Sequence, residues 1–137
     1  MAAPIYILNH KAVVDFFGCW PSFHDAKVCA YEPTTSDHPV LSFTLHTWQM
    51  TDQVDSKGFF ILRNHALVTF RFSGLYDVNM NSFTSDNILF GAKFIPVSGS
   101  DSFRVELDSV MDISGSFSAR AGEVVTVIPC GSNGAKP

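Results

Sequence analysis

The sequence predicts a mainly β protein, an antiparallel sandwich or partly open barrel of about seven to nine strands with one N-terminal helix. Short segments rich in Val, Ile, Phe and Thr recur at close spacing, and Gly, Asn, Asp and Ser separate them. This spacing is typical of antiparallel β domains. No strand-like segment is followed by a second convincing helical pattern, so the strand–helix–strand repeat of a parallel sheet is absent.

The helix is predicted between Asn9 and Gly18. The Asn9 side chain can cap its first turn, and Gly18 can end it in a left-handed conformation. An apolar stripe runs from Val13 to Phe17 and gives the helix a side to bury.

Nine later segments have the composition or the alternation of strands. The alternation is clearest at residues 103–108, where apolar and charged side chains take turns. The acidic stretch 51–58 is predicted to be an exposed connection, and Asn64 with His65 separates two strands. The predicted strands are residues 28–31, 41–48, 59–63, 66–73, 75–80, 88–97, 103–108, 113–119 and 123–128.

Length and composition favour a single domain over residues 1–137, with an ordered core at 5–129 and a flexible tail at 131–137. Hydrophobic residues make up 46% of the chain and charged residues 16%, which is typical of a globular protein. Phe accounts for 13 residues, against two Trp and three Tyr. Because Phe has no polar tip, we expect most of these rings in the interior.

Charge and hydropathy exclude two classes of partner. The formal net charge is −4, and the nine basic residues are scattered, so we expect no nucleic-acid ligand. No apolar run approaches the roughly 20 residues of a membrane helix, and we expect no membrane partner. The opening residues lack the positive region of a secretory signal, so we expect a cytoplasmic protein.

Three cysteines, Cys19, Cys29 and Cys130, are widely spaced and include no C-x-x-C pair. An odd number at such spacing predicts neither a disulfide framework nor a zinc site. We expect three buried or half-buried thiols and no cofactor.

The most constrained segment follows the helix and reads Trp20-Pro21-Ser22-Phe23-His24-Asp25. Proline fixes its own φ and pushes the preceding residue towards an extended conformation, so the helix cannot continue. The polar side chains here lie beside two aromatic residues that favour burial. Such a turn is either a structural clasp or a site.

The structural interpretation of this turn is the one we expect. Trp20 should be mostly buried, with Ser22 or Asp25 accepting a backbone N–H and His24 packed under the indole. In the alternative, His24 and Asp25 are a catalytic base and its partner, with Ser22 or Cys19 as nucleophile. Adjacent residues on an extended chain point in opposite directions, so this pair forms only if the turn bends.

A metal site is the weaker alternative for the histidines. None of the five His residues has the spacing that places two ligands on one helical turn. Only a constellation assembled by the fold, from His24, His46 and His65, would bind a metal.

The order of several motifs resembles the immunity protein 50 family of bacterial polymorphic toxin systems. The resemblance lies in the Trp20–Asp25 run, in Met50-Thr51-Asp52, in the stretch 62–72 and in Asn87-Ile88-Leu89-Phe90-Gly91. It covers roughly residues 16–128. It implies mainly β structure, no catalytic residues to carry over, and a protein that binds and neutralises the toxin of its own cell.

Three classes of function follow. The first is a non-enzymatic inhibitor that binds a cognate toxin domain; the others are a small-ligand-binding β-barrel and a hydrolase that uses the Trp20–Asp25 turn. For the first class, acids in predicted turns are natural contacts for a basic toxin surface, and an aromatic residue can anchor it. The partner-binding candidates are Asp52, Asp55, Asp77, Asp86 and Trp48.

Overall fold

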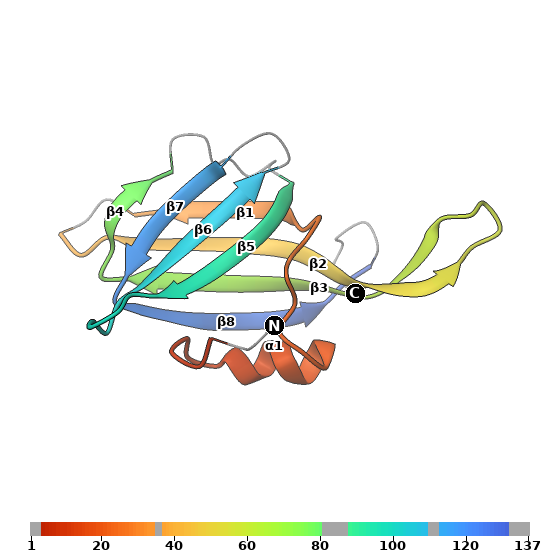
Figure 1. The fold of residues 1–137 in the computed structure, drawn as a ribbon, viewed down its shortest axis with the longest axis horizontal. Coiled ribbons are helices and arrows are strands. Elements are labelled where there is room, and N and C mark those ends of the chain that lie inside the picture. The colour runs from red at the N-terminus through yellow and green to blue at the C-terminus, as the bar shows by residue number, and fades with distance from the viewer. Residues whose placement is uncertain (1–3, 35–36, 81–87, 110–112, 132–137) are drawn as a thin grey trace.

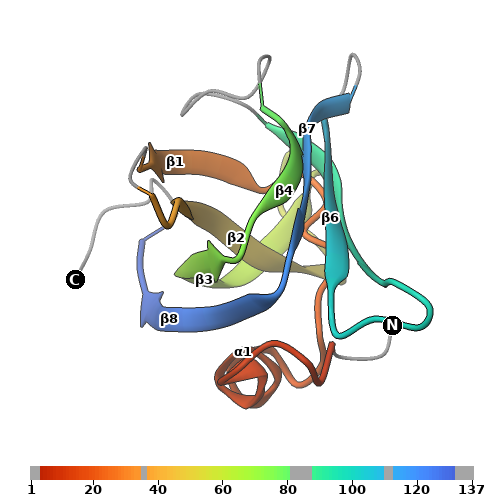
Figure 2. The same ribbon diagram turned by 90° about the vertical axis from the view of Figure 1, so that its left-hand side faces the viewer.

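The computed structural model describes residues 4–34, 37–80, 88–109 and 113–131. Within them lie one helix and eight strands, which form two four-stranded antiparallel sheets in the orders β1-β2-β3-β8 and β4-β7-β6-β5 (Figures 1 and 2). The predicted fold class is confirmed, and the two sheets do not close into a barrel. The elements are α1 His10–Phe17, β1 Lys27–Pro33, β2 Val40–Val54, β3 Phe60–Ser73, β4 Tyr76–Asn79, β5 Leu89–Pro96, β6 Phe103–Ser109, β7 Ile113–Ala119 and β8 Ala121–Pro129.

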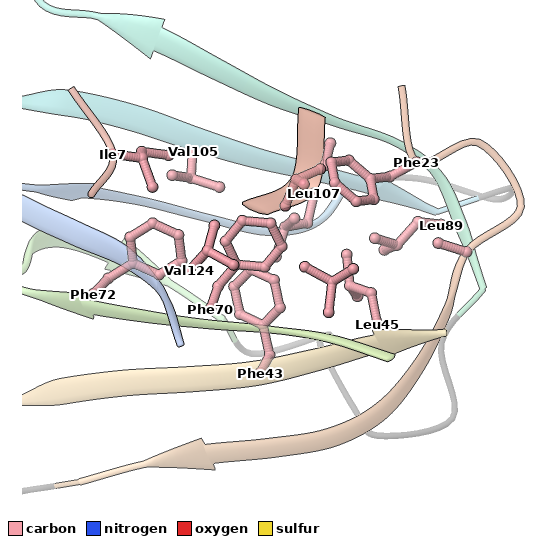
Figure 3. Close-up of a cluster of buried hydrophobic side chains, with 14 of the residues drawn as sticks. Ile7, Phe23, Phe43, Leu45, Phe70, Phe72, Leu89, Val105, Leu107 and Val124 are labelled. Atoms are coloured by element: carbon pink, nitrogen blue, oxygen red, sulfur yellow. The ribbon is translucent and has the colours of Figure 1, made fainter. Parts of the chain in front are cut away.

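The core lies between the two sheets, and among the described residues six of its 12 largest fully buried side chains are Phe, as expected (Figure 3). Phe43 of β2 stacks on Phe72 of β3 at a ring-centroid distance of 5.6 Å. Phe72 reaches the opposite sheet, at 5.9 Å from Phe103 of β6 and 5.0 Å from Phe117 of β7. All of these rings are buried, so packed aromatic side chains fill this part of the space between the sheets.

The segment before α1 extends the first sheet beyond β8. Leu8 forms a parallel bridge to Glu123, donates its N–H to the Gly122 carbonyl at 2.9 Å, and accepts the Val124 N–H at 2.9 Å. The helix then buries Val13 and Phe17 in the core. This part of the chain therefore covers the edge of β8 and anchors α1 there.

The predicted ends of α1 are half correct. Gly18 adopts φ 79° and donates its N–H to the Val14 carbonyl at 2.7 Å, so the helix ends as predicted. The Asn9 side chain does not cap the first turn. Its amide instead donates to the Val124 carbonyl at 3.0 Å, because the nearby β8 offers an acceptor.

The Trp20–Asp25 turn joins the two sheets. Ser22 accepts the Ala92 N–H at 3.3 Å and Asp25 donates its N–H to the Leu89 carbonyl at 2.8 Å, so the turn pairs with β5. Leu89 in turn donates its N–H to the Ala26 carbonyl at 2.8 Å, just before β1 begins. The segment is thus hydrogen-bonded to β5, the edge strand of one sheet, and leads directly into β1, the edge strand of the other.

Trp20 supplies the packing of this junction. It is 3% exposed, and its indole contacts edge-on the rings of Phe70 of β3 and Phe94 of β5, at 6.1 and 5.5 Å. Its buried indole N–H has no hydrogen-bond partner within the described residues. The prediction that Trp20 is buried is confirmed, and packing is what holds it.

Two predicted interruptions are wrong. Residues 51–54, predicted as a connection, continue β2, and β3 runs unbroken through Asn64 and His65. At Asn64 the chain takes φ 54° and the register between β2 and β3 shifts. A bulge absorbs the two polar residues, so the strand does not end there.

The expected burial of the cysteines is wrong for two of the three. Cys19 and Cys29 are exposed, and only Cys130 is half-buried. Cys19 follows the helix end and Cys29 sits where the β1–β2 register shifts, so neither side chain turns into the core. Burial raises the pKa of the Cys130 thiol, and Cys29 raises it further.

No helix in the described part of the chain has the length and apolarity needed to cross a membrane.

Trp20→Ala should lower the free energy of unfolding by about 3 to 5 kcal/mol, the range for removing a large buried aromatic side chain. Trp48→Ala is the matched control, because the second tryptophan is only half-buried. Urea denaturation of both variants measures the difference. A Trp20→Ala protein as stable as the parent would show that the indole does not hold the sheets together.

Candidate functional site

A small pocket lies between the Trp20–Asp25 turn and β2. It measures about 270 Å³, and its lining consists of the turn on one side and two β2 residues on the other. We refer to it as the Trp48 pocket, lined by Pro21, Ser22, Phe23, His24, Thr47 and Trp48. The structure thereby brings the predicted turn motif and one predicted partner-binding residue to the same place.

The side chains of His24 and Asp25 contact each other at the end of the Trp20–Asp25 turn. Phe23 and Asp25 both have positive φ, 60° and 66°, and this bend brings His24 Nδ1 to 3.1 Å from Asp25 Oδ2. From the sequence we expected His24 and Asp25 to pair only if the turn bends, because adjacent side chains on an extended chain point in opposite directions. The turn does bend, so that condition is met. Ser22 Oγ accepts the His24 N–H at 3.4 Å, which confirms the predicted backbone hydrogen bond.

The predicted position of His24 under Trp20 is wrong. About half of the His24 side chain is exposed (52%), and it lines the Trp48 pocket. The bend at Phe23 sends that ring into the core against Trp20, at 5.7 Å, and leaves His24 on the surface. An imidazole held by a carboxylate is suited to acid–base chemistry, so the hydrolase alternative retains a geometric basis.

Trp48 is held in place by two histidines. His46 Nε2 and His65 Nδ1 share one hydrogen bond at 3.0 Å. The Trp48 ring lies edge-on to His46 at 5.1 Å and tilted against His65 at 5.6 Å. The indole therefore has a fixed orientation between the histidine pair and the pocket.

His46 is nearly buried, with 6% of its surface exposed. Burial lowers its pKa from the ordinary value of 6.5, and His65 and Lys27 lower it further by charge repulsion. Lys27 lies directly across from His46 in the β1–β2 register. Both neighbours oppose a positive charge on His46, so its neutral form is favoured.

The histidines do not assemble the metal site considered from the sequence. His46 and His65 meet, but no group of three or more His, Cys, Asp or Glu side chains among the described residues could hold a metal ion. The fold places His24 at the pocket, beside Asp25.

Beyond the two sheets, β2 and β3 continue as a two-stranded extension that we call the arm, residues 49–63 (Figure 1). Its base is fixed by Gln49, whose side-chain amide donates to the Phe17 carbonyl at the end of α1. Asn64 donates its own amide to Gln49 Oε1 at 2.5 Å. The helix end and the bulge thereby set the direction in which the arm leaves the sheet.

The tip of the arm is a tight turn organised by Asp55. Its Oδ1 accepts the N–H groups of Lys57 and Phe59, at 2.9 and 3.0 Å. Its backbone N–H donates to the Phe59 carbonyl at 2.8 Å, and its carbonyl accepts the Gly58 N–H at 3.1 Å. Four hydrogen bonds to one residue leave the tip little freedom, so Asp55 has a structural role.

Two large apolar side chains are exposed at this tip. Val54 is 56% exposed and Phe59 is 67% exposed. Neither was singled out from the sequence. The sequence signal that could have identified them is the polar run Asp55-Ser56-Lys57-Gly58, which is typical of a turn. Val54 precedes this run and Phe59 follows it, so both lie beside the turn.

The four predicted acids are not brought together. Asp55 is at the arm tip, Asp52 lies in β2 within the arm, and Asp77 is exposed in β4 at the other end of the molecule (Figure 1). Asp86 lies outside the described residues. The prediction that all four occupy turns is therefore wrong for Asp52 and Asp77. Asp52 lies in β2 because that strand continues past residue 48, and Asp77 lies in β4, within the strand predicted over residues 75–80.

Comparison with protein families, with curated proteins and with solved structures found no match. The resemblance to the immunity protein 50 family remains a prediction.

The unfolding free energy should fall as pH drops below 6.5. In the unfolded chain His46 takes up a proton near that pH, whereas the folded pKa is lower, so acid favours the unfolded state in this window. His46→Gln should flatten the slope between pH 6.5 and the lowered pKa. Urea denaturation at a series of pH values measures it, with the exposed His38 replaced by Gln as control.

If His46→Gln and the parent show the same pH slope, His46 does not supply the acid sensitivity.

Proposed function

We propose that this protein is a cytoplasmic, non-enzymatic immunity protein that binds a cognate bacterial toxin domain and neutralises it. The single observation that carries the proposal is the arm, which projects from the sheets and ends in a fixed turn with Phe59 exposed. The resemblance through the Trp20–Asp25 motif adds the class of partner.

The tip has the properties of an interface anchor. An exposed aromatic side chain on a preorganised turn loses little conformational entropy on binding and buries a large apolar area. Asp55 fixes the turn before the partner arrives. A projecting tip fits a concave surface, and the active-site cleft of a toxin is one whose occupation abolishes activity.

The acids contribute to the rate of encounter. The chain has a formal net charge of −4, so it would attract a basic toxin surface. This attraction extends over about one Debye length, which shortens as the salt concentration rises. Asp52 and Asp55 belong to the arm, whereas Asp77 is remote from it. We therefore assign the contact to the arm and its base, including Trp48, and leave Asp77 outside it.

A hydrolase is the second candidate, because the His24–Asp25 pair borders the Trp48 pocket. Stoichiometry separates the two functions. A binding inhibitor abolishes toxin activity only when it reaches one molecule per toxin molecule, whereas an enzyme that inactivates the toxin acts at much lower ratios. Titration of purified toxin activity with this protein measures the ratio.

Phe59→Ala should weaken toxin binding by about 2 kcal/mol or more, as expected for a central aromatic anchor. Leu8→Ala is the matched control, because Leu8 is equally exposed, at 69% against 67%, and lies before α1. Co-expression of each variant with the cognate toxin domain, sought first among the neighbouring genes, measures protection of sensitive cells. Calorimetry on the purified proteins gives the affinity.

Cells that die despite abundant folded wild-type protein would refute the immunity function. Equal protection by the parent and Phe59→Ala, with loss in Leu8→Ala, would move the contact surface to the N-terminal segment.

A further inference from the structure

The edge of β2 changes character at His46. From Leu41 to His46 the strand pairs with β1, and the last register pair joins Lys27 to His46. Beyond this point β2 continues to Val54, paired on its other side with β3. Within the described residues no strand pairs with the β1 side of residues 47–54.

The cause is the deflection of the chain before β1. If the chain ran straight back from Lys27, residues 24–26 would lie against β2 beyond His46. Asp25 and Ala26 pair instead with Leu89 of β5, at 2.8 Å in both hydrogen bonds. The turn that joins the two sheets therefore leaves the β2 edge open.

An open edge presents backbone donors and acceptors, and here two register shifts of β2 against β3, between Thr47 and Gln49 and between Met50 and Val54, interrupt their regular spacing. In a regular antiparallel ladder roughly every second residue directs its N–H and C=O to one edge. Such an edge is a template for another extended chain. Two-stranded ribbons are marginally stable on their own, so a third strand would also stabilise the arm.

The Trp48 pocket lies at the start of this edge. Thr47 and Trp48 form its β2 wall and Pro21 to His24 form the other, so it opens where the pairing with β1 stops. Its volume of about 270 Å³ is below the usual range for small-molecule sites, roughly 300 to 1,000 Å³. That size suits one side chain of a polymer better than a free cofactor.

The lining of the pocket suits a flat ring. The indole of Trp48, held by His46 and His65, gives an apolar wall of fixed orientation, and Pro21 gives a second apolar surface. Ser22 and His24 place polar groups beside these walls. Tyrosine combines an aromatic ring with a polar tip and is enriched at interface anchors.

We infer that the partner binds by strand addition: an extended segment of the partner protein pairs with the β2 edge at residues 47–54 and places an aromatic side chain in the Trp48 pocket. Main-chain hydrogen bonds supply affinity in this mode, and the pocket supplies specificity. The inference rests on the proposed function, because it names the part of a protein partner that is bound.

A peptide selection tests it without the toxin. A phage library of random linear twelve-residue peptides is selected on the wild-type protein, and the winning peptides are synthesised. We expect them to share one Tyr, Phe or Trp and to protect the amides of residues 47–54 from hydrogen exchange.

Ser22→Trp should fill the pocket from its rim and weaken these peptides about tenfold or more. Ser98→Trp is the matched control, since both serines are exposed and lie in non-strand segments. The control should bind within about twofold of the parent. Melting curves for both variants establish that they are folded, and the exchange measurement on wild-type protein does not depend on either substitution.

Three results would overturn the inference. They are peptides that bind Ser22→Trp as well as the parent, protection that falls elsewhere on the protein, and a wild-type dimer whose own contacts protect residues 47–54. If the protein protects cells in the co-expression experiment but none of the expected peptide results is obtained, the immunity function is retained and strand addition is rejected.

Discussion

The contact on which the rest of the structure depends is the junction made by residues 20–26. Its backbone pairs with Leu89 and Ala92 of β5, and Ala26 leads directly into β1, while Trp20 packs between Phe70 of β3 and Phe94 of β5. Two sheets that pack only through apolar side chains resist sliding weakly, because the hydrophobic effect has no direction. At the end away from the arm, the short connections from β3 to β4 and from β7 to β8 join the sheets, and Arg120 donates its N–H to the Ser73 carbonyl at 3.1 Å. At the arm end, hydrogen bonds from one short segment fix their relative position.

This junction also creates the candidate interaction surface. Because Asp25 and Ala26 turn towards β5, β1 begins late and the β2 edge stays open beyond His46. The same bend forms one wall of the Trp48 pocket and places His24 on the surface. Structure and proposed function therefore share one cause: the segment that stabilises the sandwich is the segment that exposes the arm base.

Sequence alone predicted the fold class, the helix end at Gly18 and the burial of Trp20, because each depends on local chemistry. The alternation of apolar and polar side chains predicts strands, a glycine that can adopt the left-handed conformation predicts a helix end, and a large aromatic residue beside proline predicts a buried turn. Each of these signals spans only a few residues. The continuous course of β3 through Asn64 and His65 could not be predicted. It depends on the pairing with β2, and polar residues at a bulge look like a turn when read without their partner strand.

The site was predicted in part. The motif residues were identified, but their proximity to Trp48 follows from the path of β1 against β2, which is a long-range property. The meeting of His46 and His65 likewise requires the β2–β3 register. The acids were chosen by charge and assumed to lie in turns, whereas the arm carries Asp52 in a strand and uses Asp55 to hold its tip.

Hydrogen exchange at three amides tests the central claim most directly. The N–H groups of Asp25, Leu89 and Ala92 make the bonds that join the turn to β5. If this junction fixes the sandwich, the three amides should exchange only on global unfolding. The free energy of opening obtained from their exchange should then equal that of the amides at the centre of β3. Exchange of these three through a far less costly local opening, with β3 still protected, would contradict the account.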